Sequence, residues 1–177
     1  MSLHLTLWTM DSPVDRLSLA TDDAGRLRGL CWGEESVRRA MRREYPQATL
    51  EAGTPVTDVI QPLNAYFSGD QAALAHVPWS LDGAAAGDGF QARVWRELAR
   101  IPPGLTLSYG EMARRAGEPG AAQAAGVALN RNPIAIALPC HRVVGAANAS
   151  GQWAMVGFGG GLERKTWLLR HEGALLI

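Results

Sequence analysis

The residues best suited to chemistry are an adjacent cysteine and histidine, Cys140 and His141, which follow Pro139. The thiolate is the reactive form of cysteine, and a thiol with a pKa near ~8.5 is mostly protonated at neutral pH. Such a thiol needs a base before it can act as a nucleophile. A lone Cys-His pair is nevertheless more often structural than catalytic, because free cysteine commonly packs as a small buried hydrophobic residue. The pair alone leaves both interpretations open.

The remaining thiol and histidine side chains are dispersed along the chain. Cys31 is far from Cys140, and neither belongs to a C-x-x-C or C-x-x-H motif, which predicts neither a disulfide framework nor a zinc finger. Free thiols are typical of a reducing compartment. We interpret Cys31, His4 and His76 as structural, and we expect no metal and no cofactor. The glycines at 159–161 lack the flanking strand and the Lys-Ser/Thr pair of a phosphate-binding loop.

The N-terminal half has the pattern of a small antiparallel sheet with helices. Leu3 to Trp8 alternates apolar and polar residues, as a half-buried strand does, and helical segments follow. The expected strands are residues 3–8, 17–20 and 27–32, and the expected helices are residues 36–45 and 59–67. Residues 79–89 are rich in Gly, Ala and Asp, and they predict a linker between an N-terminal domain, 1–78, and a C-terminal domain, 90–177.

The C-terminal half is expected to be mainly helical, so the predicted fold class is α+β. Apolar residues recur at helical spacing from Phe90 to Ile101. Two short helices, 109–116 and 121–129, joined by a Gly-containing turn, fit a helix-turn-helix, although an ordinary helical hairpin is commoner. The second of these helices carries almost no bulky side chains, which suits either close approach to a nucleic-acid groove or tight helix packing. An apolar strand is expected at 134–138.

Charge and hydropathy narrow the possible partners. Residues 1–85 carry 7 basic and 11 acidic side chains, whereas residues 86–177 carry 10 basic and 6 acidic ones, so the C-terminal half is the basic one. This asymmetry is compatible with a nucleic-acid partner but is weak evidence for one. No run of eighteen apolar residues exists, so we expect no membrane partner. The N-terminus has no signal-peptide pattern, and we expect a cytoplasmic protein.

The segment from Pro139 to Val144, PCHRVV, resembles the active-site signature of the O6-alkylguanine-DNA alkyltransferases. The similarity extends from Phe90 to Gly173 and is looser in the N-terminal half, where it implies a ribonuclease-H-like domain. Its other elements are Phe90-Gln91, Val94-Trp95, Ser108-Tyr109, Gly120-Ala121-Ala122, Asn132-Pro133, Gly159-Gly160, Arg164-Lys165, Trp167-Leu168-Leu169 and His171-Glu172-Gly173. So many matches in the same order make coincidence an inadequate explanation.

The resemblance implies roles for five residues in the transfer of an alkyl group from O6 of guanine. Cys140 accepts the group irreversibly, so each molecule acts once. His141 is its base, acting through a water molecule, and Glu172 orients His141. Asn132 braces the active-site segment. Tyr109 lies against the base and helps the guanine to depart.

The resemblance also implies a DNA-binding face and a pocket for a nucleotide extruded from the duplex. The DNA-binding residues it implies are Ala121, Ala122, Gln123, Gly126 and Arg142, and the pocket residues are Tyr109, Leu129, Val143, Phe158, Gly159 and Gly160. The expected partner is double-stranded DNA containing O6-alkylguanine, bound by a monomer. The expected activity is therefore direct-reversal repair, with O4-alkylthymine as a further substrate left open.

The chain departs from the family pattern at two places. Gln123 occupies the position of an arginine that fills the space of the extruded base, which predicts weaker DNA binding and a shallower salt dependence. The segment 145–158 is about five residues longer than usual, an extension that costs little entropy. Trp153 and Met155 in this segment either reshape the alkyl pocket and change the tolerance for bulky adducts, or form a plain solvent-exposed insertion.

Three other functions compete with alkyl transfer. The related alkyltransferase-like proteins bind the lesion without repairing it, but they characteristically lack the reactive cysteine. A Cys-His hydrolase would not explain the helix-turn-helix pattern, and a transcriptional regulator would need additional segments. The arginines of the first expected helix are interspersed with glutamates, so we interpret them as a solvated face and not as a second nucleic-acid patch.

Overall fold

The computed structural model describes residues 2–146, 149–150, 154–155 and 157–174. The chain divides into two compact units, the first formed by residues 1–87 with 133–137 and the second by residues 88–132 with 138–177. The short excursion at 133–137, which the sequence did not indicate, belongs to the first unit although both its flanks belong to the second. Among the described residues, no helix is long and apolar enough to cross a membrane.

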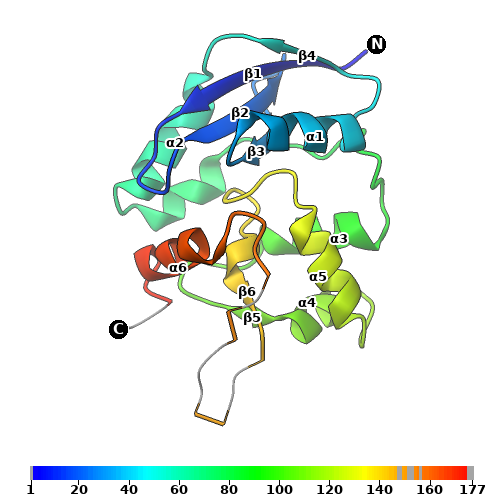
Figure 1. Ribbon diagram of the computed structural model, residues 1–177, viewed down its shortest axis with the longest axis vertical. Helices are drawn as coiled ribbons and strands as arrows, with labels where there is room; N and C mark the ends of the chain where they lie inside the picture. Colours follow the sequence, from blue (N-terminus) through cyan, green and yellow to red (C-terminus); the bar gives the residue numbers. More distant parts are fainter. Residues whose placement is uncertain (1, 147–148, 151–153, 156, 175–177) are drawn as a thin grey trace. The chain divides into compact units, whose positions relative to one another are not determined.

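The sheet of the first unit contains β1 (His4–Met10), β2 (Leu17–Asp22), β3 (Leu27–Cys31) and β4 (Thr49–Ala52), in the order β3-β2-β1-β4 (Figure 1). β2 pairs antiparallel with both β1 and β3, as expected, but β4 pairs parallel with β1. The sheet is therefore mixed, which corrects the expected antiparallel sheet. α1 (Glu34–Glu44) lies between β3 and β4 in the sequence and supplies the crossover that a parallel connection requires.

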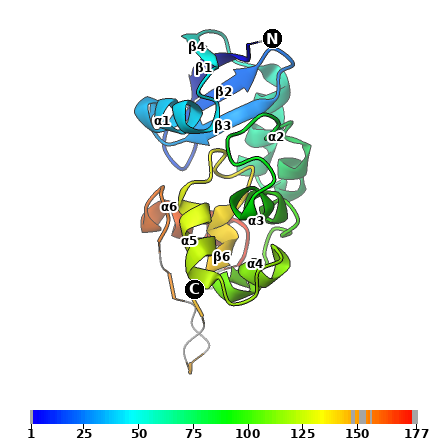
Figure 2. The same cartoon turned by 90° about the vertical axis from the view of Figure 1, so that its right-hand side faces the viewer.

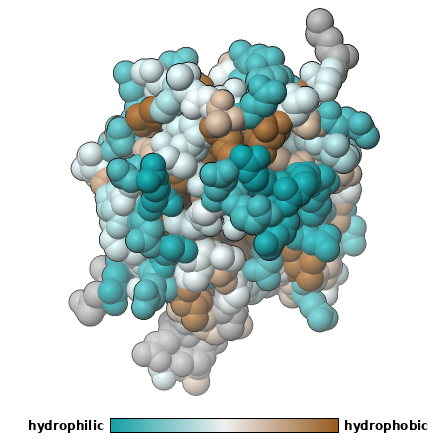
Figure 3. Space-filling model, turned by 45° about the horizontal axis from the view of Figure 1, so that its top comes forward, coloured by the Kyte–Doolittle hydropathy of each residue, from teal (hydrophilic) through white to brown (hydrophobic). Residues whose placement is uncertain are grey.

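Helix α1 packs an apolar stripe against this sheet. Val37, Ala40 and Met41 belong to the same buried cluster as Leu5 and Leu7 of β1, the two inward-facing leucines of its alternating pattern. On the exposed side of α1, Arg38 pairs with Glu34 and Arg42 pairs with Glu35, whereas the partner of Arg43, Glu44, is buried with its side chain 2% exposed. The first two ion pairs support the interpretation of α1 as a solvated helix face. Figure 3 shows hydrophilic side chains over much of this end of the molecule, with smaller apolar areas between them.

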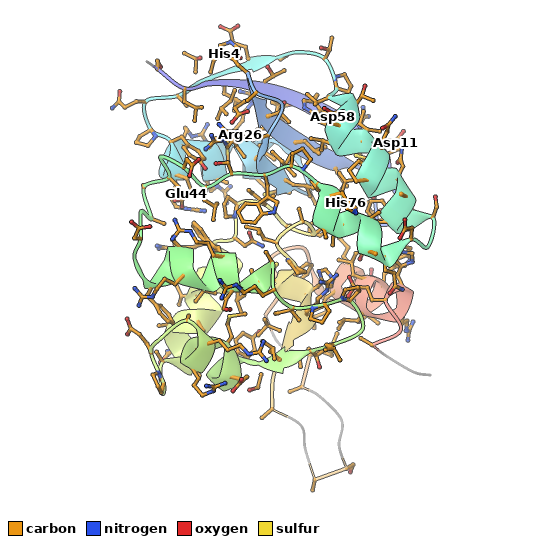
Figure 4. All side chains as sticks on the ribbon, turned by 180° about the vertical axis from the view of Figure 1, so that it is seen from behind. His4, Asp11, Arg26, Glu44, Asp58 and His76 are labelled. Atoms are coloured by element: carbon orange, nitrogen blue, oxygen red, sulfur yellow. The ribbon has the colours of Figure 1, made fainter. Side chains whose placement is uncertain are left out.

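The rest of the first unit is helical. α2 (Thr57–Phe67) buries Val59, Leu63 and Tyr66, and the 3-10 helix η1 (Gln71–His76) follows it. Figure 4 shows His4 and His76 well separated, on β1 and at the end of η1. Within the described part of the chain, no group of three His, Cys, Asp or Glu residues could hold a metal ion.

The second unit is built from helices around a two-stranded parallel sheet. Its elements are α3 (Phe90–Leu98), β5 (Leu107–Ser108), α4 (Tyr109–Arg115), α5 (Ala122–Asn130), the 3-10 helix η2 (Cys140–Arg142), β6 (Val143–Val144) and α6 (Leu162–His171). Leu107 of β5 pairs with Val143 of β6. α5 packs against both α3 and α4 (Figure 2), and the indole of Trp95 donates a hydrogen bond to the Ala128 carbonyl at 2.8 Å.

Local capping explains where α4 begins. The Ser108 side chain accepts a hydrogen bond from the Glu111 amide, as an N-cap residue does. Arg93 of α3 donates to the Ala116 carbonyl at 2.8 Å and pairs with Glu118, so it holds the turn between α4 and α5. The helix pair predicted from the sequence is thus present at 109–115 and 122–130.

The segment 134–138 differs from its prediction. It is buried, as its apolar composition requires, but it forms turns and a single bridge between Ile134 and Leu30 instead of a strand. Ile136 has a φ of 69°, which breaks the extended conformation. Cys140 consequently starts a 3-10 turn and does not end a strand. Apolar runs of this length report burial but not the backbone conformation.

Candidate active site

A fully buried pair of side chains, His141 and Glu172, forms the centre of the candidate site. η2 carries His141, and Glu172 caps the C-terminus of α6, just before Gly173 with its positive φ of 72°. His141 Nε2 lies 2.8 Å from Glu172 Oε1, and both side chains are 0% exposed.

The hydrogen bonds and charges around Glu172 and His141 determine which of their atoms carry protons. Burial alone would raise the pKa of Glu172, but the hydrogen bonds and charges of His141 and Arg142 hold it well below its usual range. An ionised carboxylate only accepts hydrogen bonds, so Nε2 of His141 carries the proton. Nδ1 then keeps its lone pair, and it is buried without a hydrogen-bond partner among the described residues. This tautomer leaves Nδ1 as the basic atom of the ring.

Arg142 was expected to contact DNA, and the structure corrects this expectation. Its side chain is only 4% exposed. Its Nε donates to Glu172 Oε2 at 2.9 Å, its Nη2 donates to Glu172 Oε1 at 2.8 Å, and its Nη1 donates to the Ile101 carbonyl. The resemblance assigned Arg142 to the DNA-binding face, but this guanidinium is bound inside the second unit.

Cys140 is buried beside groups that favour its thiolate. Burial raises the pKa of the thiol, while the Asn132 side chain, the Lys165 ammonium and the backbone amides of Cys140 and His141 act in the opposite direction. Asn132 Nδ2 also donates to the Leu138 carbonyl at 2.7 Å. One amide group thus braces the segment before Cys140 and contributes a hydrogen bond to the sulfur.

Lys165 is a functional candidate that the sequence indicates only as part of the Arg164-Lys165 motif. Its side chain is fully buried in α6, and its Nζ donates to the Val143 carbonyl at 2.7 Å. Burial lowers the pKa of this ammonium, and the charge of Cys140 raises it. A signal was present in the sequence, because Lys165 lies on the same helical face as the buried Leu168 and Leu169, where a lysine is unusual.

Tyr109 lies at the start of α4, near the cysteine. Burial and the charge of Cys140 raise the pKa of its hydroxyl. An added Cβ at Gly126 would lie 3.7 Å from the Tyr109 ring, an ordinary van der Waals contact, so α5 and the Tyr109 ring are neighbours. The Tyr109 hydroxyl donates to the Gly157 carbonyl at 3.5 Å. The structure therefore brings Tyr109, Asn132, Cys140, His141 and Glu172 into one region of the second unit.

The remaining pocket candidates surround this region less closely. Leu129 and Val143 are buried, Phe158 and Gly160 are half-buried, and Gly159 is exposed. Arg164 donates to the Gly160 carbonyl at 3.1 Å, which fixes the loop before α6. In the long segment 145–158, the Gly145 amide donates to the Ala154 carbonyl at 2.7 Å, and the described parts project beyond β5 and β6 (Figure 1). Trp153 lies outside the described residues, so the effect of this segment on bulky adducts stays a prediction.

The outer face of α5 has few bulky groups. Gln123 and Ala124 are exposed, whereas Ala121, Ala122 and Gly126 are half-buried. The exception is Val127, which is 50% exposed. The face is therefore smooth and carries an amide at position 123.

Comparison with known proteins identifies the family of the chain. Residues 89–174 match the family model described as 6-O-methylguanine DNA methyltransferase, DNA binding domain. Proteins named methylated-DNA–protein-cysteine methyltransferase are 38% identical in Shigella flexneri, with 94% of each chain covered, and 44% identical in Mycolicibacterium paratuberculosis, with 95% of this chain and 94% of the relative covered. The crystal structure of Mycobacterium tuberculosis OGT in complex with DNA is 37% identical, with a TM-score of 0.70 over 96% of this chain and 92% of that one. The chain belongs to the family of methylated-DNA–protein-cysteine methyltransferases.

Proposed function

We propose that the protein repairs DNA by moving a methyl group, or another small alkyl group, from O6 of guanine to Sγ of Cys140. The observation that carries this proposal is the arrangement at His141, the residue after Cys140, where Nε2 lies 2.8 Å from Glu172 Oε1 and the buried Nδ1 keeps its lone pair. A buried thiol with a base and an orienting carboxylate is an activated nucleophile. The names of the relatives support the same reaction.

The reaction balances without a cofactor. The thiol proton passes to Nδ1 of His141 through a water molecule, and the thiolate attacks the alkyl carbon. The S–C bond forms as the bond between that carbon and O6 breaks, and the electron pair stays with guanine. A proton returns to the guanine with the help of the Tyr109 hydroxyl. A thioether does not hydrolyse under physiological conditions, so the alkyl group stays on Sγ of Cys140 and each molecule acts once.

The described face of α5 supports a DNA duplex as the partner. We propose that α4 and α5 act as a helix-turn-helix, with Ala121, Ala122 and Gly126 against the minor groove. Small side chains allow the backbone to approach the groove closely, and the target nucleotide must leave the helix because its O6 substituent is inaccessible inside a duplex. The DNA complex of the Mycobacterium tuberculosis relative supports this partner. Action as a monomer and a cytoplasmic location stay predictions.

Mass spectrometry after incubation with a duplex containing O6-methylguanine tests the proposal. We expect one added methyl group on the peptide that contains Cys140 and an unmodified Cys31 peptide. Cys31→Ser is the matched control because it removes the other thiol, and it should react like the wild type, whereas Cys140→Ser should not react. Binding to the duplex without any adduct on the wild type would identify a lesion-binding module instead and would refute alkyl transfer.

The amide at position 123 gives a separate test of the DNA-binding face. Gln123→Arg adds a cation to an exposed position of α5. We expect tighter DNA binding, and a slope of log K against log salt that is steeper by about 0.9 for one added phosphate contact. Gln123→Lys and Gln123→Ala separate charge from side-chain length. Unchanged Kd and repair rate in Gln123→Arg would show that α5 does not lie against the duplex at this position.

A further inference from the structure

Arg142 uses each nitrogen of its guanidinium inside the second unit, in a way that the expected DNA contact does not explain. Nε and Nη2 form a two-point contact with the Glu172 carboxylate, at 2.9 and 2.8 Å, and Nη1 holds the Ile101 carbonyl. Two parallel hydrogen bonds between planar groups fix their relative orientation as well as their distance. The Glu172 carboxylate therefore cannot rotate without breaking both bonds.

The contact between Arg142 and Glu172 determines which carboxylate oxygen accepts the hydrogen bond of His141. Oε2 of Glu172 accepts from Arg142 Nε, while Oε1 accepts from both Arg142 Nη2 and His141 Nε2. The position of Oε1, and hence the orientation of the imidazole ring, depends on the guanidinium. Arg142 also reaches Ile101, 41 positions earlier in the chain, so the orientation is tied to the segment that follows α3.

The charges around His141 give Arg142 a second effect. Burial lowers the pKa of His141, Glu172 raises it, and the cations Arg142 and Lys165 lower it. Cys140, which precedes His141, is in turn influenced by Lys165, and its charge acts on Tyr109 of α4. Arg142 thus partly offsets the charge of Glu172, and an imidazole beside a partly neutralised carboxylate holds a proton less strongly.

We propose that Arg142 is a positioning residue of the alkyl-transfer site, which orients Glu172 and thereby fixes the tautomer of His141. The inference rests on the proposed function, because it assigns His141 the role of the base. A purely structural role would predict only a loss of stability when Arg142 is replaced. The two roles differ in what happens to the histidine proton.

Two variants separate the orientation of Glu172 from the neutralisation of its charge. Arg142→Lys keeps a positive charge but cannot form the two-point contact. Arg142→Met removes both. Arg28→Lys is the matched control, because Arg28 is also a buried arginine bonded to a carboxylate, 2.8 Å from Asp22, but it lies in the first unit.

Two measurements, neither of which needs DNA, report the protonation of His141 and of the Cys140 thiol. Nitrogen-15 NMR of labelled histidine reports which ring nitrogen of His141 carries the proton, with the signal assigned by its loss in His141→Gln. The rate of Cys140 alkylation by iodoacetamide, measured against pH, reports the groups that control the thiolate.

We expect the wild type to show the Nε2–H tautomer alone and both Arg142 variants to show a mixture. In Arg142→Met, the imidazolium persists to higher pH, so the acidic limb of the alkylation profile moves upward by about one pH unit. In Arg142→Lys, the limb stays near its wild-type position, and the rate falls by about tenfold or more because the base is misoriented. Arg28→Lys should leave the tautomer and the profile unchanged.

The proposal is overturned if the Arg142 variants lose thermal stability but keep the wild-type tautomer and the wild-type acidic limb. If Arg142→Met does not fold, the tautomer in Arg142→Lys decides. Methyl transfer from O6-methylguanine is measured in parallel on the wild type. Its absence would refute the proposed function, whereas the NMR and iodoacetamide results test the role of Arg142 independently of it.

Discussion

The first unit buries Asp22 against Arg28, and the second buries Glu172 against Arg142, with no side chain of the four more than 4% exposed. Both pairs are close, with nitrogen–oxygen distances of 2.8 Å. A buried ion pair is weak evidence for either stability or function on its own, because the desolvation of two charges offsets much of their attraction. The difference between the two pairs lies in what else each carboxylate binds.

Asp22 is surrounded by groups that belong to its own hairpin. Oδ1 accepts from the backbone amides of Ala24 and Arg26, and Oδ2 accepts from the Arg26 and Arg28 side chains. The Arg28 guanidinium also donates to the Asp82 carbonyl at 2.6 Å. Every one of these bonds fixes the turn between β2 and β3 or attaches the following chain to it, so the cluster has a structural role.

Glu172 Oε1 accepts a hydrogen bond from the His141 imidazole, whose other nitrogen, Nδ1, has no hydrogen-bond partner among the described residues. The cluster around Glu172 joins η2, the end of α6 and Ile101, and it leaves Nδ1 of His141, the residue after Cys140, without a partner in the described part of the chain. The Asp22 carboxylate binds only backbone amides and arginine side chains, so it holds the chain in place. The Glu172 carboxylate also binds an imidazole whose second nitrogen can accept a proton, so it can support proton transfer.

Neutralising the two carboxylates gives the largest contrast. Glu172→Gln removes the group that fixes the His141 tautomer, and we expect the rate of methyl transfer to fall by on the order of 10³-fold. Asp22→Asn should leave the rate per folded molecule unchanged. Single-turnover assays on an O6-methylguanine duplex measure both, with the folded fraction determined by circular dichroism. Equal losses in the two variants would remove the distinction between the clusters.

The stability of the first unit gives the second contrast. Asp22→Asn leaves the buried Arg28 without its counter-charge, and removing one member of a buried ion pair destabilises a protein by about 3 kcal/mol or more. Urea unfolding followed by fluorescence measures the change in the free energy of unfolding. Asp11→Asn is the control, because Asp11 is exposed and its ion pair with Arg16 spans 3.9 Å. A similar free energy in both variants would show that the Asp22 cluster does not hold the hairpin.

The buried ammonium of Lys165 distinguishes the second unit further. Lys165→Met removes a charge that lowers the pKa of Cys140, so the thiol should become less acidic. We expect its alkylation by iodoacetamide at pH 7 to slow by about tenfold, the effect of one pKa unit. Arg170→Met removes an exposed cation from the same helix and should have no effect. An unchanged rate for Lys165→Met would mean that the ammonium serves only the Val143 carbonyl.

Acid should destabilise the two units at different pH values. Because burial lowers the pKa of His141, the unfolded chain takes up a proton near pH ~6.5, where folded His141 stays neutral. The stability that this neutral group contributes is present above about pH 6.5 and is lost as the pH falls towards its folded pKa. In the folded protein the pKa of Asp22 is instead lowered below the ordinary value of an aspartate. Its contribution to the free energy of unfolding is therefore present above about pH 4 and is lost only as the pH falls below that value.

Hydrogen exchange of amides between pH 7 and pH 5, corrected for intrinsic exchange, measures this smallest effect. We expect amides of the second unit to lose protection over this range while those around Asp22 keep theirs. His141→Gln should abolish the pH dependence in the second unit. The same loss in both units, or none in the second, would contradict the assignment of this effect to His141.

Much of the fold followed from local patterns. The alternation in β1, the turn after β2 and the periodicity of α1 and α3 each describe neighbouring residues, and the structure has these elements close to their expected places. The parallel strand β4 and the turns at 134–138 were not predictable in the same way. Both depend on pairing with distant segments, β1 in one case and Leu30 in the other.

The residues of the candidate site also fall into those that local sequence indicates and those that depend on distant segments. The types and order of Cys140, His141 and Glu172 were sufficient to indicate the family and the chemistry, because a nucleophile, a base and an acid are recognisable as residue types within a motif. The partners of Arg142 and the burial of Lys165 came only from the tertiary structure. Arg142 meets groups 30 and 41 positions away in the chain, and Lys165 meets a carbonyl 22 positions away. A sequence pattern shows that a side chain is charged, but only the folded chain decides whether that charge faces solvent or a buried carboxylate.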